Sequence, residues 1–222
     1  MLEATDLYKF FHTADEETLA LRGVSVSDAA GEIVAITGPS GSGKSTLLAC
    51  LAGLDEPDGG MVVVAGTPLS RRPEAERSRL RSRHIGMLFQ SNNLLDHLSV
   101  AGNVAIAQRL RGRTDNRSIP ELLEILDLGH RATARPSQLS GGESARAGLA
   151  VALANDPDII VADEPTGELD VEAARAVLGI LAERAANGAA VVLVTHNADV
   201  TEIAHRIVEL HDGAVAIRQA KP

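Results

Sequence analysis

A glycine-rich run placed between a strand and a helix constrains this chain more than any other segment. The run GPSGSGKST occupies Gly38–Thr46, after the β-branched-rich segment Gly31–Thr37 and at the start of the helical pattern Lys44–Leu54. It matches the spacing G-x-x-x-x-G-K-[ST], in which a strand, a turn and a helix together surround phosphate groups. The chain is therefore expected to form an α/β fold with a mostly parallel sheet and to bind a nucleotide.

The residue types in this run each meet a requirement of phosphate binding. Glycines allow backbone conformations that side chains forbid, so that successive N–H groups point at one phosphate. The helix that begins near Lys44 aims its positive N-terminal end at the same group. The Lys44 ammonium can reach the β- and γ-phosphate oxygens, and the Ser45 hydroxyl can bind Mg²⁺. We expect the nucleotide-binding residues of the loop to be Gly38, Pro39, Ser40, Gly41, Ser42, Gly43, Lys44, Ser45 and Thr46.

A second apolar strand ends in two acidic residues. In the segment DIIVADE, Asp158–Glu164, the apolar part is typical of a strand buried on both faces of a parallel sheet. The carboxyl end of such a strand lies at the same sheet edge as the phosphate loop. We therefore expect Asp163 to hold Mg²⁺, through water, and Glu164 to polarise an attacking water.

A third segment, LSGGE at Leu139–Glu143, predicts another anion-binding helix start. Its two glycines and Ser140 lie at the start of a helix, Ser144–Ala154. Only the first of the two phosphate-binding motifs carries a lysine and an acidic partner strand. This asymmetry indicates that the second motif serves the nucleotide of another subunit.

Composition limits the possible partners. The chain has 222 residues with 30 acidic and 21 basic side chains, a formal net charge of −9, and 2% aromatic residues. These values argue against nucleic acid as a partner. One cysteine, Cys50, excludes an intramolecular disulfide. The start resembles no secretory signal, and the longest apolar runs are shorter than a membrane span needs, so we expect an intracellular, soluble chain.

The order of predicted elements indicates one domain, 1–222, with an insertion. Strand candidates Met61–Ala65, Ile85–Gln90 and Ala190–Thr195 alternate with helices, whereas the middle of the chain reads as helical, at Ser99–Leu110, Ile119–Leu128 and Gly142–Ala154. We expect a core of about 1–90 and 153–222 and a helical subdomain of about 91–152. The basic cluster Arg71–Arg83 predicts a solvated helix, and Arg206–Gln219 predicts a hairpin.

Taken in order, these motifs resemble an ABC-type ATPase. The set comprises the Walker A run Gly38–Ser45, Gln90, Leu139–Glu143, VADEPTGELD at Val161–Asp170, and His196, and it spans nearly the whole chain. Further strings, GLDEPDGG and IGMLFQSNNLLDHLSVAGNVA, are similar to the ATPase subunits of the lipoprotein-release, macrolide-efflux and cell-division group. Those subunits work with membrane permeases that carry large extracytoplasmic domains. The resemblance implies a P-loop NTPase core with an N-terminal antiparallel β part.

The resemblance also implies a role for individual residues. Glu164 matches the catalytic glutamate, and His196 matches the switch histidine that contacts the γ-phosphate. Gln90 matches the glutamine that senses Mg²⁺ and the γ-phosphate, so that the implied metal set is Ser45, Gln90 and Asp163. The residues expected to act in trans, on the nucleotide of the partner subunit, are Ser140, Gly141, Gly142 and Asp170.

The adenine-binding aromatic is less closely fixed by the sequence. The family usually has a tyrosine ten residues before the strand Leu21–Val26, and that count reaches Phe11, with Tyr8 and Phe10 as alternatives. Milder departures from the family pattern occur at Glu143 and Glu168. None of them removes a phosphate, metal or water ligand.

The resemblance implies a mechanism with two copies of the chain. They are expected to bind two ATP–Mg²⁺ head to tail, and the opening that follows hydrolysis is expected to drive an integral membrane permease. The chain would then be cytoplasmic and peripheral on the inner face of the membrane. The alternative is a soluble or regulatory ABC ATPase, for cofactor assembly or control of cell-wall hydrolases, that moves no cargo.

Overall fold

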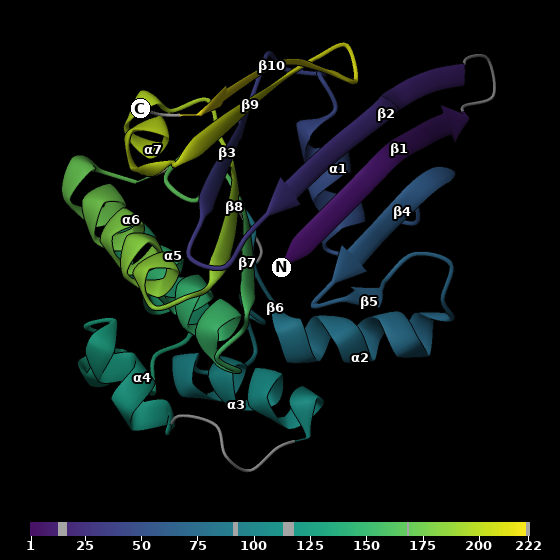
Figure 1. The fold of residues 1–222 in the computed structure, drawn as a ribbon. Coiled ribbons are helices and arrows are strands. Elements are labelled where there is room, and N and C mark those ends of the chain that lie inside the picture. Colours follow the sequence, from purple (N-terminus) through teal and green to yellow (C-terminus); the bar gives the residue numbers. More distant parts are fainter. Residues whose placement is uncertain (13–16, 91–92, 113–117, 168, 221–222) are drawn as a thin grey trace.

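The computed structural model describes every residue except 13–16, 91–92, 113–117, 168 and 221–222. Two sheets form the molecule (Figure 1): a six-stranded sheet in the order β10-β9-β3-β8-β7-β6 and a four-stranded sheet in the order β2-β1-β4-β5. The strands are β1 (Leu2–His12), β2 (Glu17–Asp28), β3 (Ile33–Thr37), β4 (Gly59–Val64), β5 (Thr67–Pro68), β6 (Ile85–Leu88), β7 (Ile159–Asp163), β8 (Ala190–Val194), β9 (Arg206–His211) and β10 (Ala214–Ala220). The helices are α1 (Lys44–Leu51), α2 (Glu74–His84), α3 (Val100–Arg111), α4 (Ile119–Ile125), α5 (Gly141–Leu153), α6 (Val171–Ala186) and α7 (Ala198–Ile203), with 3₁₀ turns η1 (Gly129–Arg131) and η2 (Pro136–Gln138).

The six-stranded sheet is mostly parallel, as the sequence predicts. β9, β3, β8, β7 and β6 pair in parallel, and β10 adds an antiparallel edge through the predicted hairpin. The central strands are continuous apolar runs because each of their faces meets a separate core. In β3, Ile33 and Ala35 join the core under α3–α6, whereas Val34 and Ile36 join the core around α1. The alternation of side chains along a strand thus fills both cores.

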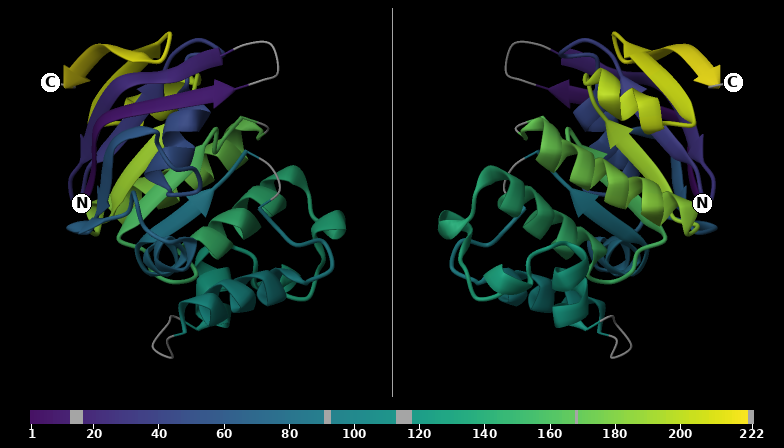
Figure 2. Two further views of the ribbon diagram at one scale, coloured as in Figure 1. Left: turned by 90° about the vertical axis from the view of Figure 1, so that its right-hand side faces the viewer. Right: turned by 90° about the vertical axis from the view of Figure 1, so that its left-hand side faces the viewer.

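The antiparallel sheet of β1, β2, β4 and β5 packs over α1, which lies between the two sheets (Figure 1). On the opposite side, α5 and α6 cover the parallel sheet, and α3 and α4 lie at one end of the molecule (Figure 2). The solvated helix predicted from the basic cluster is α2, none of whose side chains is buried. The short helix α7 is an element that the sequence did not indicate.

Between β6 and β7 the described residues form helices only, α3, α4 and α5 with the turns η1 and η2. Ser99 caps α3 through the amide of Gly102, and Ser118 caps α4 with Glu121 in a reciprocal pair of hydrogen bonds. Among the described residues, every helix is too short or too polar to cross a membrane.

Candidate active site

A cleft of about 770 Å³ lies at the carboxyl ends of β3, β7 and β8 and extends along β2. Such an edge is where parallel α/β sheets bind ligands. The structure brings most of the predicted residues together there, from five separate parts of the chain. The predicted residues that line the cleft are Phe11, Gly38, Ser40, Gly41, Gly43, Lys44, Ser45, Thr46, Gln90, Asp163, Glu164 and His196.

The glycine-rich loop is held by close backbone contacts. A Cβ atom on Gly38, which has a φ of 141°, would lie 2.1 Å from the carbonyl oxygen of Leu210 in β9. On Gly43, with a φ of 97°, it would lie 2.5 Å from the carbonyl oxygen of Ala20 in β2. Glycine is required at both positions because the conformation and the neighbouring backbone leave no space for a side chain.

Two predicted loop residues contribute little to the wall of the cleft. Pro39 and Ser42 do not line it, and Ser42 is 2% exposed. The Ser42 carbonyl accepts a hydrogen bond from the Gly213 amide at 3.1 Å, so this residue ties the loop to the β9–β10 turn. The Lys44 ammonium donates to the carbonyl oxygens of Gly38 and Pro39 at 2.9 and 2.8 Å, which keeps it against the loop.

Asp163 ends β7 and meets the helix that follows the loop. Burial raises the pKa of its carboxyl group and the nearby charge of Glu164 adds to this, while a hydrogen bond from the Ser45 side chain acts in the opposite direction. No group of three or more His, Cys, Asp or Glu among the described residues could hold a metal alone. A hydroxyl and one carboxylate that face a phosphate loop nevertheless fit Mg²⁺, which usually takes its other ligands from water and substrate phosphates.

Glu164 lies in a left-handed backbone conformation with a φ of 46° directly after β7. Its carboxylate lies 2.6 Å from Nδ1 of His196 and accepts a hydrogen bond from the Thr195 hydroxyl at 3.2 Å. The Glu164 side chain is 12% exposed, whereas that of His196 is 74% exposed. The Glu164 carboxylate is therefore fixed inside the cleft, and the His196 imidazole lies at the rim of the cleft. In this position the carboxylate can orient a water molecule.

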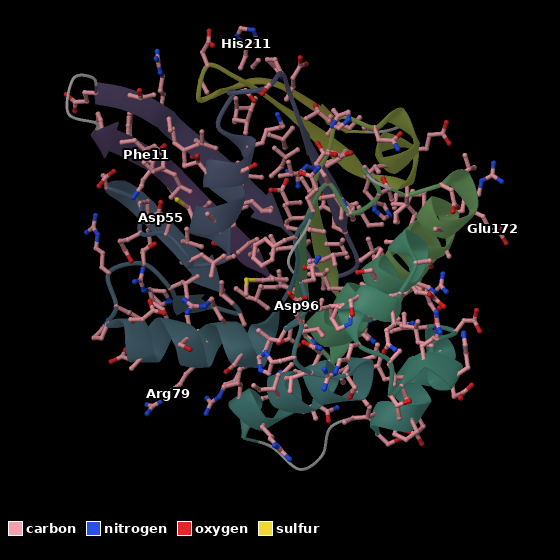
Figure 3. All side chains as sticks on the ribbon, turned by 180° about the vertical axis from the view of Figure 1, so that it is seen from behind. Phe11, Asp55, Arg79, Asp96, Glu172 and His211 are labelled. Atoms are coloured by element: carbon pink, nitrogen blue, oxygen red, sulfur yellow. The ribbon has the colours of Figure 1, made fainter. Side chains whose placement is uncertain are left out.

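The residues predicted to act in trans lie together, outside this cleft. Ser140, Gly141, Gly142 and Asp170 line a separate depression of about 600 Å³ between α5 and α6. Asp170 caps α6 through the amide of Ala173 at 2.9 Å. A Cβ atom on Gly142 would lie 3.0 Å from the Cβ of Ala173, so the two helix starts are in close contact. In Figure 3, Phe11 in the cleft and Glu172 in the depression lie on opposite sides of the molecule.

Of the three aromatic alternatives, Phe11 is the one that lines the cleft. Its ring is 43% exposed and lies 5.6 Å from Nζ of Lys9, measured to the ring centroid. Tyr8 instead packs over Gly59 and Gly23, where Cβ atoms would lie 3.3 and 3.0 Å from the tyrosine side chain.

Several residues that line the cleft were not predicted from the sequence as site residues. Arg22 and Asp212 both line it, and the amide of Arg22 donates to the carbonyl oxygen of Gly213 at 2.7 Å. The turn at Asp212-Gly213 predicts a hairpin, but its position beside the loop depends on the pairing of β9 with β3.

Comparison with known proteins gives a consistent result. Residues 21–167 match the ABC transporter family. An uncharacterized ABC transporter ATP-binding protein of Thermotoga maritima is 41% identical over 218 residues, which are 97% of this chain and 93% of that protein. The macrolide export ATP-binding/permease protein MacB of Burkholderia pseudomallei is 42% identical over 226 residues, and the match covers 100% of this chain. It covers 34% of that protein, so the chain spans about a third of the length of the MacB relatives.

Solved structures agree in fold. The dimeric ATP-binding cassette MJ0796 in a post-hydrolysis state with ADP and Pi superposes with a TM-score of 0.92 and 33% identity, over 99% of this chain and 98% of that one. A nucleotide-free cassette from an ABC transporter has a TM-score of 0.85 and 25% identity, over 100% of this chain and 92% of that one. The α/β architecture therefore has solved counterparts.

Proposed function

Because the chain belongs to the ABC transporter family and is an ATPase of that family, we propose that two copies close head to tail on two ATP molecules and drive a membrane permease. One observation carries this proposal. The phosphate loop and Glu164 line one cleft, whereas Ser140 and Gly142 line another depression of the same chain. A second copy related by a two-fold axis brings each depression to the other's nucleotide with one self-complementary surface.

Within each composite site, Phe11 stacks on the adenine, and the loop with Lys44 holds the phosphates. Ser45, Gln90 and Asp163 would hold Mg²⁺, and the ion would supply positive charge that offsets the negative charge developing on the phosphate oxygens. Glu164 orients the attacking water, since its carboxylate is fixed by Thr195 and His196. Hydrolysis then depends on positioning and on electrostatic stabilisation.

The segment 91–152 moves, in this proposal, as a helical subdomain against the core 1–90 and 153–222. Gln90 lies at the boundary between the core and the helical subdomain. It lines the nucleotide cleft and also a groove of about 280 Å³. That groove is lined on its other side by Gly141 and Ser144 of α5. When the γ-phosphate is lost, the position of Gln90 therefore changes, and the position of the helical subdomain changes with it.

The permease docks on the surface beside Gln90, at the inner face of the membrane. Phe89 and Leu95 are large apolar side chains that are exposed there. The MacB relatives support this partner, because their name joins an ATP-binding part with a permease and this chain matches about a third of their length.

Two experiments test the proposal. The Glu164→Gln variant with ATP and Mg²⁺ should elute as a dimer in size-exclusion chromatography with light scattering, whereas Lys44→Ala should remain monomeric. A monomeric Glu164→Gln at saturating ATP would contradict closure. Reconstitution with a membrane permease similar to the permease part of the MacB proteins should stimulate ATP hydrolysis, and Leu95→Ser should reduce that stimulation more than Ile125→Ser, an exposed apolar control on α4. Absence of stimulation by that permease would argue against the proposed partner.

A further inference from the structure

An arginine outside every predicted motif is bound to the helix start that carries Ser140. Arg131, the last residue of η1, donates from Nε to Oε1 of Glu143 at 2.7 Å and from Nη2 to Oε2 at 3.0 Å. Nη2 also donates to the carbonyl oxygen of Gln138 at 3.0 Å. Two parallel bonds between a guanidinium and a carboxylate fix distance and orientation together. Arg131 thus ties η1, η2 and the first turn of α5 into one unit.

Glu143 passes this constraint on to Ser140. Its Oε2 accepts the Ser140 amide at 2.8 Å, and its own amide donates to the Ser140 hydroxyl oxygen at 3.2 Å. The two residues form a capping box at the start of α5. Because the Ser140 oxygen already accepts an N–H group, its hydroxyl hydrogen is left to donate. In the described part of the chain, no acceptor takes that hydrogen.

The same turn offers two more donors. The amides of Gly141 and Gly142 are the first two of α5, and neither has an acceptor among the residues that the structure describes. Ser140, Gly141 and Gly142 therefore present three donors at one helix start. A phosphate oxygen, which only accepts hydrogen bonds, is the complement of this set.

Without a nearby cation, the negative charge of the Glu143 carboxylate would repel an anion bound at this helix start. The hydrogen bond from Arg131, followed by the bond from the Ser140 amide, lowers the pKa of Glu143 to about 2, so the group is ionised at neutral pH. His130 lies farther off, with Nε2 3.7 Å from Oε1 of Glu143. Arg131 is therefore the permanent cation that balances the negative charge three residues from Ser140.

We propose that Arg131 is a positioning residue for ATP hydrolysis, which cancels the charge of Glu143 and fixes Ser140 as a donor to the γ-phosphate held by the partner subunit. This inference rests on the proposed function, since it needs the depression around Ser140 to meet a second nucleotide. Arg131 itself does not touch the nucleotide. Its effect on hydrolysis passes through Glu143, and that dependence is what distinguishes it from a residue that merely stabilises the fold.

The test compares four variants by steady-state ATP hydrolysis. Arg131→Ala should lower kcat about tenfold, less than the ~100-fold that loss of an entire preorganised donor costs. Glu143→Gln should remain near wild type, because a glutamine keeps the capping box without the charge. The double variant with both changes should recover most of the lost rate, since no carboxylate is left to balance. The kcat of Arg131→Lys should lie between those of Arg131→Ala and wild type. An ammonium restores the positive charge but not the two parallel hydrogen bonds of the guanidinium.

Controls separate this effect from a loss of stability and from a failure of the dimer proposal. Arg184→Ala removes a comparable ion pair, with Asp156, on the far end of α6 and should leave kcat unchanged. Thermal melting of each monomer reports folding, and binding of a fluorescent ATP analogue to each monomer should be unchanged. Wild-type kcat in Arg131→Ala, or a double variant no faster than Arg131→Ala at equal melting temperature, would overturn the inference. Failure of Glu164→Gln to dimerise would instead overturn the proposed function.

Discussion

Nδ1 of His196 lies 2.6 Å from Oε1 of Glu164, although the two residues are 32 positions apart in the chain. Their meeting follows from the sheet register. β7 and β8 are parallel neighbours, Asp163 pairs with Val194, and each functional residue follows the end of its strand. The Glu164 amide also donates to the Val194 carbonyl oxygen at 2.9 Å, so the pairing extends one residue past the strand. The geometry of this pair is therefore set by the pairing of two interior strands of the six-stranded sheet.

Replacement of Glu164 tests its assigned role. Glu164→Gln keeps the size of the side chain and removes the charge that orients water. We expect ATP binding to be retained and hydrolysis to fall ~100-fold or more, the range of a lost general base. Measured turnover near the wild-type rate would show that another group orients the water.

Phe11 and Tyr8 offer a matched pair for the adenine contact. Phe11→Ala should weaken ATP binding by about 1–3 kcal/mol, the usual value of one base–aromatic stack. Tyr8→Ala should affect thermal stability rather than affinity, because Tyr8 packs over Gly59 outside the cleft. Isothermal titration of both variants with ATP measures the two affinities. A loss of affinity in Tyr8→Ala and none in Phe11→Ala would assign the adenine contact to Tyr8.

A mixing experiment tests action in trans. Ser140→Arg should abolish hydrolysis while monomers still bind ATP, since Ser140 lies outside the cleft of its own chain. A Lys44→Ala chain should also be inactive by itself. In the mixed dimer, the Ser140→Arg chain keeps its own loop and receives an unmodified Ser140 from its partner, so some activity should return. Loss of ATP binding by the isolated Ser140→Arg monomer would place Ser140 in its own chain's site.

A buried carboxylate predicts a pH dependence of stability. Asp28 is 2% exposed and both of its carboxylate oxygens lack a hydrogen-bond partner among the described residues. Burial, with a further contribution from Glu32, raises its pKa to about 8. Since the unfolded value is ~3.9, the folded state holds an extra proton between these values, and stability falls as pH rises through this window.

Asp28→Asn should remove that dependence. At pH 8, where Asp28 is partly ionised, we expect the free energy of unfolding of the variant to exceed that of the wild type by on the order of 1–3 kcal/mol. The variant should therefore melt at a higher temperature. At pH 4, close to the unfolded pKa, the carboxyl is protonated in the folded state and partly protonated in the unfolded state, so the difference should be small. Thermal melts at the two pH values measure this, and an equal shift at both would rule out titration of Asp28 as its cause.

The aromatic contact illustrates what a count along the chain leaves open. β1 has irregular pairing between Leu7 and Tyr8 and between Lys9 and Phe10. Each irregularity changes the face on which the following side chains lie, so an alternation rule cannot choose between neighbouring aromatics. The count from the next strand predicted Phe11, and the folded register places that side chain in the cleft. Ser42 was also predicted as a binding residue from its place in the loop, and packing buries its side chain, so its contact with a nucleotide stays a prediction.

The sequence by itself determined the family and the α/β architecture, and it predicts the chemistry of each local motif. It could do so because a phosphate loop needs particular residues at fixed short spacings, and because parallel strands buried on both faces are continuous apolar runs. The tertiary structure alone decided which residues meet across long separations. Sheet register joined Glu164 to His196, β9 brought Asp212 beside the loop, and the turn η1 brought Arg131 to Glu143. These contacts depend on how elements pack in three dimensions, which no short spacing records.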